Sequence, residues 1–206
     1  HLVGIAVGRA LAKSPGLNGR IVWGAFEPYD TIDVSYLVAL DGGADLAKVK
    51  IDRIDTKSMT DVAAELRERA DRLKNKEDAD FEKSKGLLRA LPTWLLRPLL
   101  FVTGFFASAI GVSVPALGIE RFPFGSCIIT SVGMLGLDEG FAPPTPFART
   151  PLLILVGAIT DRPAVVDGEL AIRPQLTITA TIDHRFIDGF QGGILAREAR
   201  SVLENP

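Results

Sequence analysis

The spacing of apolar residues predicts three amphipathic helices, one near each end of the chain and one between them. Ser58 and Asp61 resemble a capping box at the start of the middle helix, with aspartate in place of glutamate. The sequence Ser-Pro-Gly-Leu-Asn-Gly ends the first helix. The predicted helices cover residues 2–14, 58–76 and 189–205.

Runs of β-branched and aromatic residues predict the strands between these helices. Residues 20–26 and 31–40 are expected to pair with each other across the turn Glu-Pro-Tyr-Asp. Asp167 and Gly168 mark the turn of a hairpin over residues 164–172, because this dipeptide is a strong hairpin signal. The order of helices and strands predicts an α+β layered fold rather than regular βαβ winding. The other predicted strands cover residues 47–55, 126–133, 175–183 and 150–160, the last apolar enough to be buried on both faces.

Residues 87–119 form a long apolar stretch that carries no charge between Arg97 and Glu120. Its length meets the threshold for a membrane-spanning candidate, although prolines and glycines interrupt it. We consider three interpretations, in order of preference: a buried core or oligomer contact, a hairpin that dips into a membrane interface, and a true span. The charged run before it, residues 74–85, is typical of a solvated helix or loop.

Composition narrows the class of protein. The chain has 206 residues, of which 47% are hydrophobic and 23% charged, and this fits one globular domain. The net charge of −2 argues against a basic surface for nucleic acid. Cys127 is the only cysteine, and His1 and His184 are the only histidines, so an internal disulfide and a metal site built on two internal histidines are excluded. The apolar start lacks the basic segment of a signal peptide, so we expect a core helix and a chain that is a fragment of a longer one.

The segment Asp-His-Arg-Phe-Ile-Asp-Gly, from Asp183 to Gly189, holds the residues best suited to chemistry. A regular strand leads into His184 and a helix follows at once, which places the imidazole at a strand end beside the sheet. A neutral imidazole there can take a proton from a thiol or a hydroxyl. Asp188 can orient nearby groups by ion pairing, and it can equally cap the helix that follows. From these residues alone, a structural or surface role for His184 remains the alternative to catalysis.

Several segments resemble the catalytic domain of the acyltransferase components of 2-oxo acid dehydrogenase complexes. Every fixed position of the family motif Asp-His-Arg-x-x-Asp-Gly is present at residues 183–189, and segments 125–137 and 152–179 resemble two further family motifs. The likeness extends more loosely over the N-terminal half and leaves out about residues 75–123, an atypical apolar insertion. It implies a single acyltransferase catalytic domain over residues 1–206. The implied fold is an α+β, chloramphenicol-acetyltransferase-like domain, with a mixed β-sheet packed with helices as a trimeric building block.

The resemblance also implies a mechanism for thiol acylation. His184 would be the general base that activates the thiol of coenzyme A, or of dihydrolipoamide in the reverse direction, for attack on an acyl thioester. The hydroxyl of Thr130 would donate to the oxyanion that forms, with Ser131 as the fallback donor. Asp188 would brace the site through an arginine partner. These four residues are the candidate catalytic residues, and the family implies no metal.

For assembly, the resemblance implies a homotrimer whose site lies between two copies, and trimers of this family build cages of 24 or 60 chains. Coenzyme A or acyl-coenzyme A is then a substrate, and the lipoyl group is carried by a separate domain or chain. Partners from a dehydrogenase complex, and a location in the bacterial cytoplasm or alternatively the mitochondrial matrix, are expected from the family. No nucleic-acid partner is expected, and membrane contact through residues 98–119 is the less favoured alternative.

The chain departs from the family pattern at several places, and two of them bear most on the function. Lys48 and Lys50 stand in a segment where the family has a proline along the acyl-substrate channel. The connection from the middle helix to the strand of Thr130 is much longer than in the family. The alternative functions are therefore a cage-forming homologue with a mainly structural role and a membrane-associated acyltransferase with a non-lipoyl acceptor.

Overall fold

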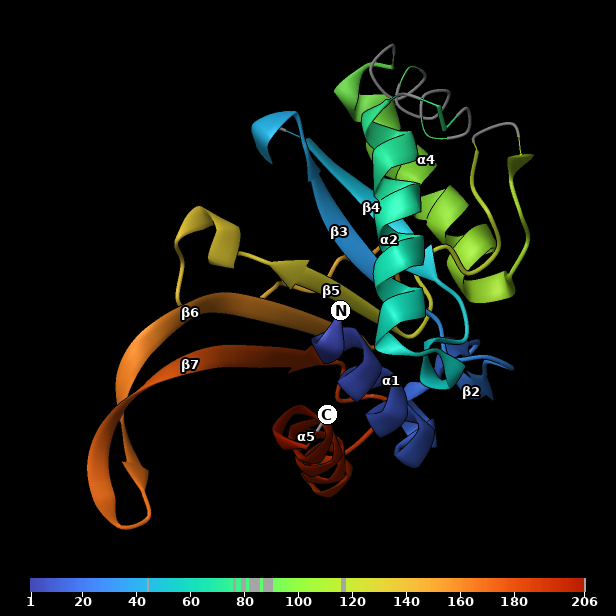
Figure 1. The fold of residues 1–206 in the computed structure, drawn as a ribbon. Coiled ribbons are helices and arrows are strands. Elements are labelled where there is room, and N and C mark those ends of the chain that lie inside the picture. Colours follow the sequence, from blue (N-terminus) through green and yellow to red (C-terminus); the bar gives the residue numbers. More distant parts are fainter. Residues whose placement is uncertain are drawn as a thin grey trace.

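A mixed five-stranded sheet forms the centre of the computed structural model (Figure 1). The structure describes residues 1–43, 45–75, 77, 78, 81, 86, 91–115 and 118–205. The strands of the sheet are β3 (Val34–Leu40), β4 (Asp45–Ile51), β5 (Cys127–Ser131), β6 (Leu152–Val166) and β7 (Glu169–Ile182). They lie in the order β4-β3-β5-β6-β7, with parallel inner pairs and antiparallel outer pairs. The prediction of an α+β fold with a mixed sheet is confirmed.

Three helices pack on one face of this sheet, and the predicted helices are confirmed. They are α1 (Leu2–Lys13), α2 (Met59–Lys74) and α5 (Gly189–Glu204). The capping box of α2 is present, because the Ser58 hydroxyl accepts from the Asp61 amide at 3.2 Å and the Asp61 carboxylate accepts from the Ser58 amide at 3.2 Å. The main core lies between helices and sheet and includes Ile5, Leu11, Val34, Tyr36, Val49, Ile51, Val62, Cys127, Ile129, Leu152, Ile154 and Leu195.

The N-terminal strands pair differently from the prediction. β1 (Gly19–Val22) and β2 (Ala25–Pro28) form a separate two-stranded sheet, whereas β3 pairs with β4 and β5. Trp23 and Gly24 form the turn between β1 and β2, with φ angles of 52° and 84°, as in a tight two-residue hairpin. The predicted pairing across Glu-Pro-Tyr-Asp is therefore wrong, because the first predicted strand folds back on itself at this turn.

β6 and β7 form one long hairpin where the sequence predicts shorter, separate strands. Its turn at Asp167 and Gly168 is confirmed, with φ angles of 53° and 87°. The predicted breaks near Pro163 and Pro174 are wrong, because a proline is tolerated where a strand has a free edge, as in this two-stranded extension. Residues 152–155 are buried, as predicted, but the outer half of the hairpin projects away from the sheet (Figure 1).

The apolar stretch forms α4 (Thr93–Gly104), which continues into a π-helical turn, η4 (Phe105–Ile110). Its inner side packs against the loop before β6, since a Cβ added at Gly104 would lie 2.6 Å from the Phe147 carbonyl oxygen. Only 28% of this 18-residue stretch is buried, so the interpretation as a core helix is wrong. Contact with another copy or with a membrane stays a prediction. The charged run 74–85 lies largely outside the described residues.

Candidate active site

The end of β7 places His184 in an exposed turn. The Asp183 amide donates to the Pro151 carbonyl at 2.9 Å, which holds the chain against the start of β6 just before the turn. The Phe186 amide donates to the Asp183 carbonyl at 3.0 Å and closes the turn. The His184 side chain forms no hydrogen bond or ion pair with any residue that the structure describes. Its imidazole is therefore available to a ligand or to another copy of the chain.

A pocket of about 360 Å³ opens beside His184. Leu153, which lines it, belongs to a small second core cluster on the sheet face away from α1 and α5, whereas Ile182, which also lines it, packs against the main core. The pocket therefore lies at the end of the sheet where β6 begins and β7 ends. The residues that line the pocket are Pro144, Thr150, Pro151, Leu153, Thr181, Ile182, Asp183, His184 and Arg185. Within the described ranges, no three histidine, cysteine, aspartate or glutamate side chains form a group that could hold a metal ion.

An ion pair between Asp183 and Arg185 stiffens the turn on both sides of His184. The Arg185 guanidinium donates from Nε to both Asp183 oxygens at 3.0 Å and from Nη2 to Oδ2 at 2.5 Å. These hydrogen bonds hold the pKa of Asp183 below its usual range, so the carboxylate is ionised at neutral pH. The pair therefore contributes stability above the usual carboxyl range and loses it as the pH falls through the lowered pKa. The Asp-x-Arg spacing of the motif is the sequence signal for this pair.

Asp188 caps the helix that follows the turn. Its carboxylate accepts from the amides of Phe190 and Gln191 at 3.0 Å, and the Gln191 side chain accepts from the Asp188 amide at 3.2 Å. Such a capping box satisfies free amides at the start of α5. Among the described residues of a single chain no arginine pairs with Asp188, and its role of bracing a site shared between copies stays a prediction.

Replacing Asp188 with alanine is expected to lower the free energy of unfolding by about 1 kcal/mol, because a helix loses its N-cap. Asp188→Asn keeps an oxygen at the same place and is expected to stay near wild-type stability. Urea denaturation of both variants measures this difference. Equal stability of wild type and Asp188→Ala would show that the cap contributes nothing.

Thr130 and Ser131 lie at the end of β5. Cys127 and Ile129 face the main core, so alternation along the strand turns Thr130 to the opposite face, together with Ile128. Thr130 is partly buried, and its hydroxyl makes no hydrogen bond to the described part of the chain. Ser131 is exposed. The Thr130 hydroxyl is thus available to donate on the sheet face opposite the main core.

Within one chain, the structure does not bring Thr130 and His184 together. Thr130 is level with Leu155 of β6, which is level with Thr179 of β7. His184 follows Thr179 by five residues, which corresponds to about 16 Å along the strand direction, in addition to two strand spacings of about 4.8 Å. Neither Thr130 nor Ser131 lines the pocket beside His184.

Two glycines fix the chain after Thr130 against β6. A Cβ added at Gly133 would lie 2.6 Å from the Gly157 carbonyl oxygen, and one added at Gly157 would lie 1.8 Å from the Asp138 carbonyl oxygen. The approach occurs at a register shift of β6 that begins at Val156. Packing therefore requires glycine at both positions, Gly133 in the family-like segment 125–137 and Gly157 in the segment 152–179. The close approach holds the end of β5 in place.

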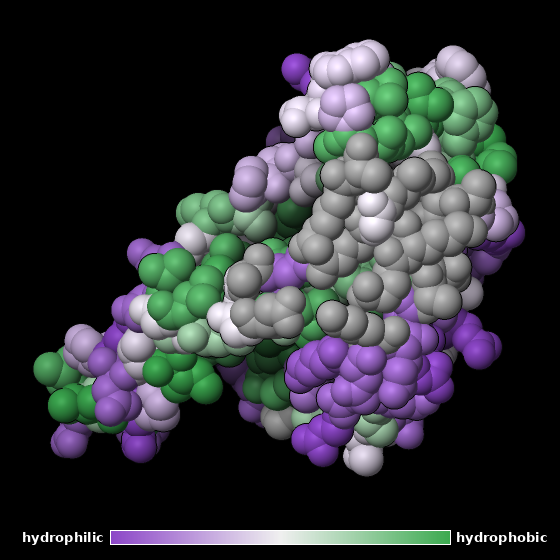
Figure 2. Space-filling view, turned by 90° about the horizontal axis from the view of Figure 1, so that it is seen from above, coloured by the Kyte–Doolittle hydropathy of each residue, from purple (hydrophilic) through white to green (hydrophobic). Residues whose placement is uncertain are grey.

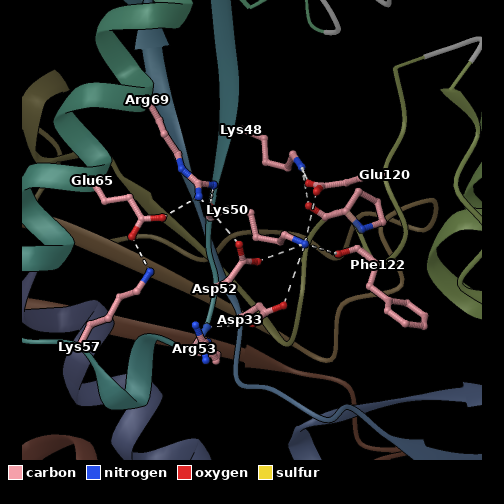
Figure 3. A network of polar contacts seen from close by, with 11 residues as sticks. Asp33, Lys48, Lys50, Asp52, Arg53, Lys57, Glu65, Arg69, Glu120 and Phe122 are labelled. Carbon is pink, nitrogen blue, oxygen red and sulfur yellow. Dashed lines mark hydrogen bonds and ion pairs between the residues drawn. The ribbon is translucent and has the colours of Figure 1, made fainter.

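Lys48 and Lys50, the departures from the family pattern, take part in a polar network within the chain (Figure 3). Lys48 Nζ lies 2.7 Å from a Glu120 oxygen, and Lys50 Nζ lies 3.4 Å from Asp52, 3.5 Å from Glu120 and 4.0 Å from Asp33. Burial lowers the pKa of Lys48, and the carboxylate of Glu120 opposes this shift. The two lysines thus attach the end of the insertion to β4, and neither lines the His184 pocket.

The whole chain has the fold of the chloramphenicol-acetyltransferase-like domains. A "probable dihydrolipoamide acetyltransferase" from Listeria monocytogenes 4b F2365 matches 98% of this chain and 68% of its own, with a TM-score of 0.71 at 21% identity. The cubic core of the pyruvate dehydrogenase multienzyme complex matches 99% of this chain and 67% of its own, with a TM-score of 0.70 at 18% identity. Chloramphenicol acetyltransferase itself gives a TM-score of 0.50 over 98% of this chain and 76% of its own, at 16% identity. The predicted fold class is confirmed.

Sequence comparison finds relatives for the C-terminal part of the chain. Residues 116–206 match the family model of the 2-oxoacid dehydrogenases acyltransferase catalytic domain. The lipoamide acyltransferase component of the branched-chain alpha-keto acid dehydrogenase complex of Pseudomonas putida is 35% identical over 89 residues, which cover 42% of this chain. The match spans 20% of that relative's length. The resemblance deduced from the motifs is confirmed.

Proposed function

We propose that this chain is the catalytic domain of an acyltransferase that moves an acyl group between coenzyme A and a thiol carrier such as dihydrolipoamide. The observation that carries the proposal is the imidazole of His184, which lies beside a pocket without a partner among the described residues, within the part of the chain that matches the family model. The name of the Pseudomonas putida relative, a lipoamide acyltransferase component, supports a lipoyl thiol as the carrier. The lipoyl group is then held by a separate domain or chain.

In the proposed reaction, His184 takes the proton of the attacking thiol. The resulting thiolate adds to the thioester carbonyl, and the Thr130 hydroxyl donates a hydrogen bond to the oxyanion, with Ser131 as the fallback donor. When the carbonyl re-forms, the bond from carbon to the original sulfur breaks, and the leaving thiolate takes the proton back from His184. The attacking thiol and the acyl thioester are the substrates, and the new thioester and the released thiol are the products, so the step is balanced without a further reactant.

The proposed site is completed by a second copy of the chain, because His184 and Thr130 are far apart within one copy. The projecting hairpin supports such contacts, since it leaves several large apolar side chains in solvent. These side chains are Ile159, Val165, Leu170 and Ile172. The solved cubic core of similar fold supports a larger assembly, for which the trimer implied by the family resemblance would be the building block.

Two measurements on the wild-type protein test this proposal. Acyl transfer from acyl-coenzyme A to free dihydrolipoamide is expected, and light scattering is expected to give a trimer or a multiple of three chains. An active monomer would contradict the shared site. An assembly that transfers no acyl group to any thiol would contradict the enzymatic function and favour a structural, cage-forming role.

A further inference from the structure

We infer that α4 and η4, together with the turn between β1 and β2, form a surface that docks on a lipid bilayer containing anionic lipids. We call this surface the aromatic face and define it by Trp23, Trp94, Phe101, Phe105 and Phe106. It is separate from the His184 pocket, and the inference does not depend on the proposed acyl transfer.

The helix of this face is apolar but largely unburied. The stretch Thr93–Ile110 has a mean hydropathy of 1.5, and a core helix of that composition would be mostly buried rather than 28% buried. Trp94 is 75% exposed and Phe101 is 64% exposed. The C-terminal end of the stretch is anchored, because Arg20 donates to the Ala109 carbonyl at 2.7 Å. The segment is therefore held firmly while its aromatic side chains point away from the core.

Trp23 extends the aromatic face from a different part of the chain. It occupies the β1–β2 turn with a positive φ of 52°, which is unfavourable for a bulky residue, and it is 85% exposed. Its ring packs edge-on against Phe105 at 5.5 Å. With Trp94, it accounts for both tryptophans of the chain. Tryptophan is enriched where proteins meet the headgroup region of a membrane.

Two arginines at this face favour an anionic lipid surface as its binding partner. The Arg149 guanidinium lies 5.9 Å from the Phe101 ring and 5.4 Å from the Phe105 ring, and its buried Nε has no hydrogen-bond partner among the residues that the structure describes. Arg97 is exposed on α4. Neither arginine pairs with a carboxylate in the described part of the chain. Lipid phosphates complement this charge, whereas the same face of a second copy would oppose it with like charges.

The α4 part of the aromatic face lies away from the β6–β7 hairpin (Figure 1). Figure 1 places α4 at the opposite end of the molecule from α5 and the β6–β7 hairpin. In Figure 2, hydrophobic side chains gather at the upper right, where α4 lies, and the hydrophilic side chains of α2 lie at the lower right. A bilayer could therefore bind this end while the hairpin contacts another copy.

Tryptophan fluorescence tests the inference directly, because both tryptophans belong to the aromatic face. Vesicles of phosphatidylcholine with phosphatidylglycerol are expected to shift the emission of the wild-type protein to shorter wavelength and to co-sediment with it. Phosphatidylcholine vesicles alone are expected to bind it more weakly. The absence of any shift and of co-sedimentation with both kinds of vesicle would overturn the inference.

Substitutions separate the contribution of the aromatic side chains to vesicle binding from the contribution of the arginine charges. Phe101→Ser is expected to lower the affinity for both kinds of vesicle by about tenfold or more. Arg97→Gln and Arg149→Gln are each expected to lower it by about fivefold, only for anionic vesicles. Phe190→Ser, which removes an equally exposed aromatic ring on α5, serves as the matched control. An emission shift that grows with protein concentration without vesicles would overturn the inference in favour of a second copy.

Discussion

Replacing His184 with alanine is expected to lower the rate of acyl transfer by about 10²–10⁴-fold, which is the usual contribution of a positioned general base. The imidazole stands in a turn fixed by Asp183 and Arg185 and has no partner among the described residues, so its removal leaves the surrounding contacts in place. The effect is measured as the rate of acyl exchange between acyl-coenzyme A and dihydrolipoamide, monitored by the release of free coenzyme A.

His1 provides the matched control for this experiment, because it is the only other histidine of the chain. It precedes α1 and makes no side-chain capping bond, so His1→Ala is expected to retain wild-type activity. Light scattering of both variants is expected to match the wild type. If His184→Ala transfers acyl groups as fast as the wild type, His184 is not the base.

Local signals explain the parts of the fold that could be predicted from the sequence. The Ser58 capping box and the Asp167-Gly168 turn depend only on residues close together in the chain, and both are present. The Trp23 turn was missed because a bulky residue with a positive φ is rare, and nothing near it marks a turn as strongly as Asp-Gly does. The gaps predicted between residues 150–160, 164–172 and 175–183 are absent, because a free strand edge tolerates the prolines that lie in them.

The candidate site also has a part that local signals predict and a part that they do not. The motif around His184 is contiguous, so the strand end, the turn and the Asp188 cap follow from it. The separation of His184 from Thr130 depends on how β5, β6 and β7 are aligned, which no local pattern encodes. The exposure of α4 is equally invisible in a hydropathy profile, because a core helix and an exposed apolar helix have the same composition.

Thr130→Val is expected to lower acyl transfer by about 10²–10³-fold, because valine keeps the shape of threonine and removes the hydrogen bond to the oxyanion. Thr130→Ser keeps a hydroxyl and is expected to retain most of the activity. Ser131→Ala is expected to change the rate little. If Ser131→Ala is the variant that loses activity, the donor is Ser131 and the assignment of Thr130 is wrong.

Co-expression of His184→Ala chains with Thr130→Val chains tests whether the site is shared between copies. In a closed trimer, each site takes His184 from one chain and Thr130 from its neighbour. An intact site forms where a Thr130→Val chain supplies His184 and the neighbouring His184→Ala chain supplies Thr130. Equal random mixing is therefore expected to restore about a quarter of wild-type activity, although each variant alone is nearly inactive. A site contained in one chain would leave the mixture as inactive as its components. The mixture thus tests the separation of His184 and Thr130 seen in the strand register, independently of which acyl group is carried.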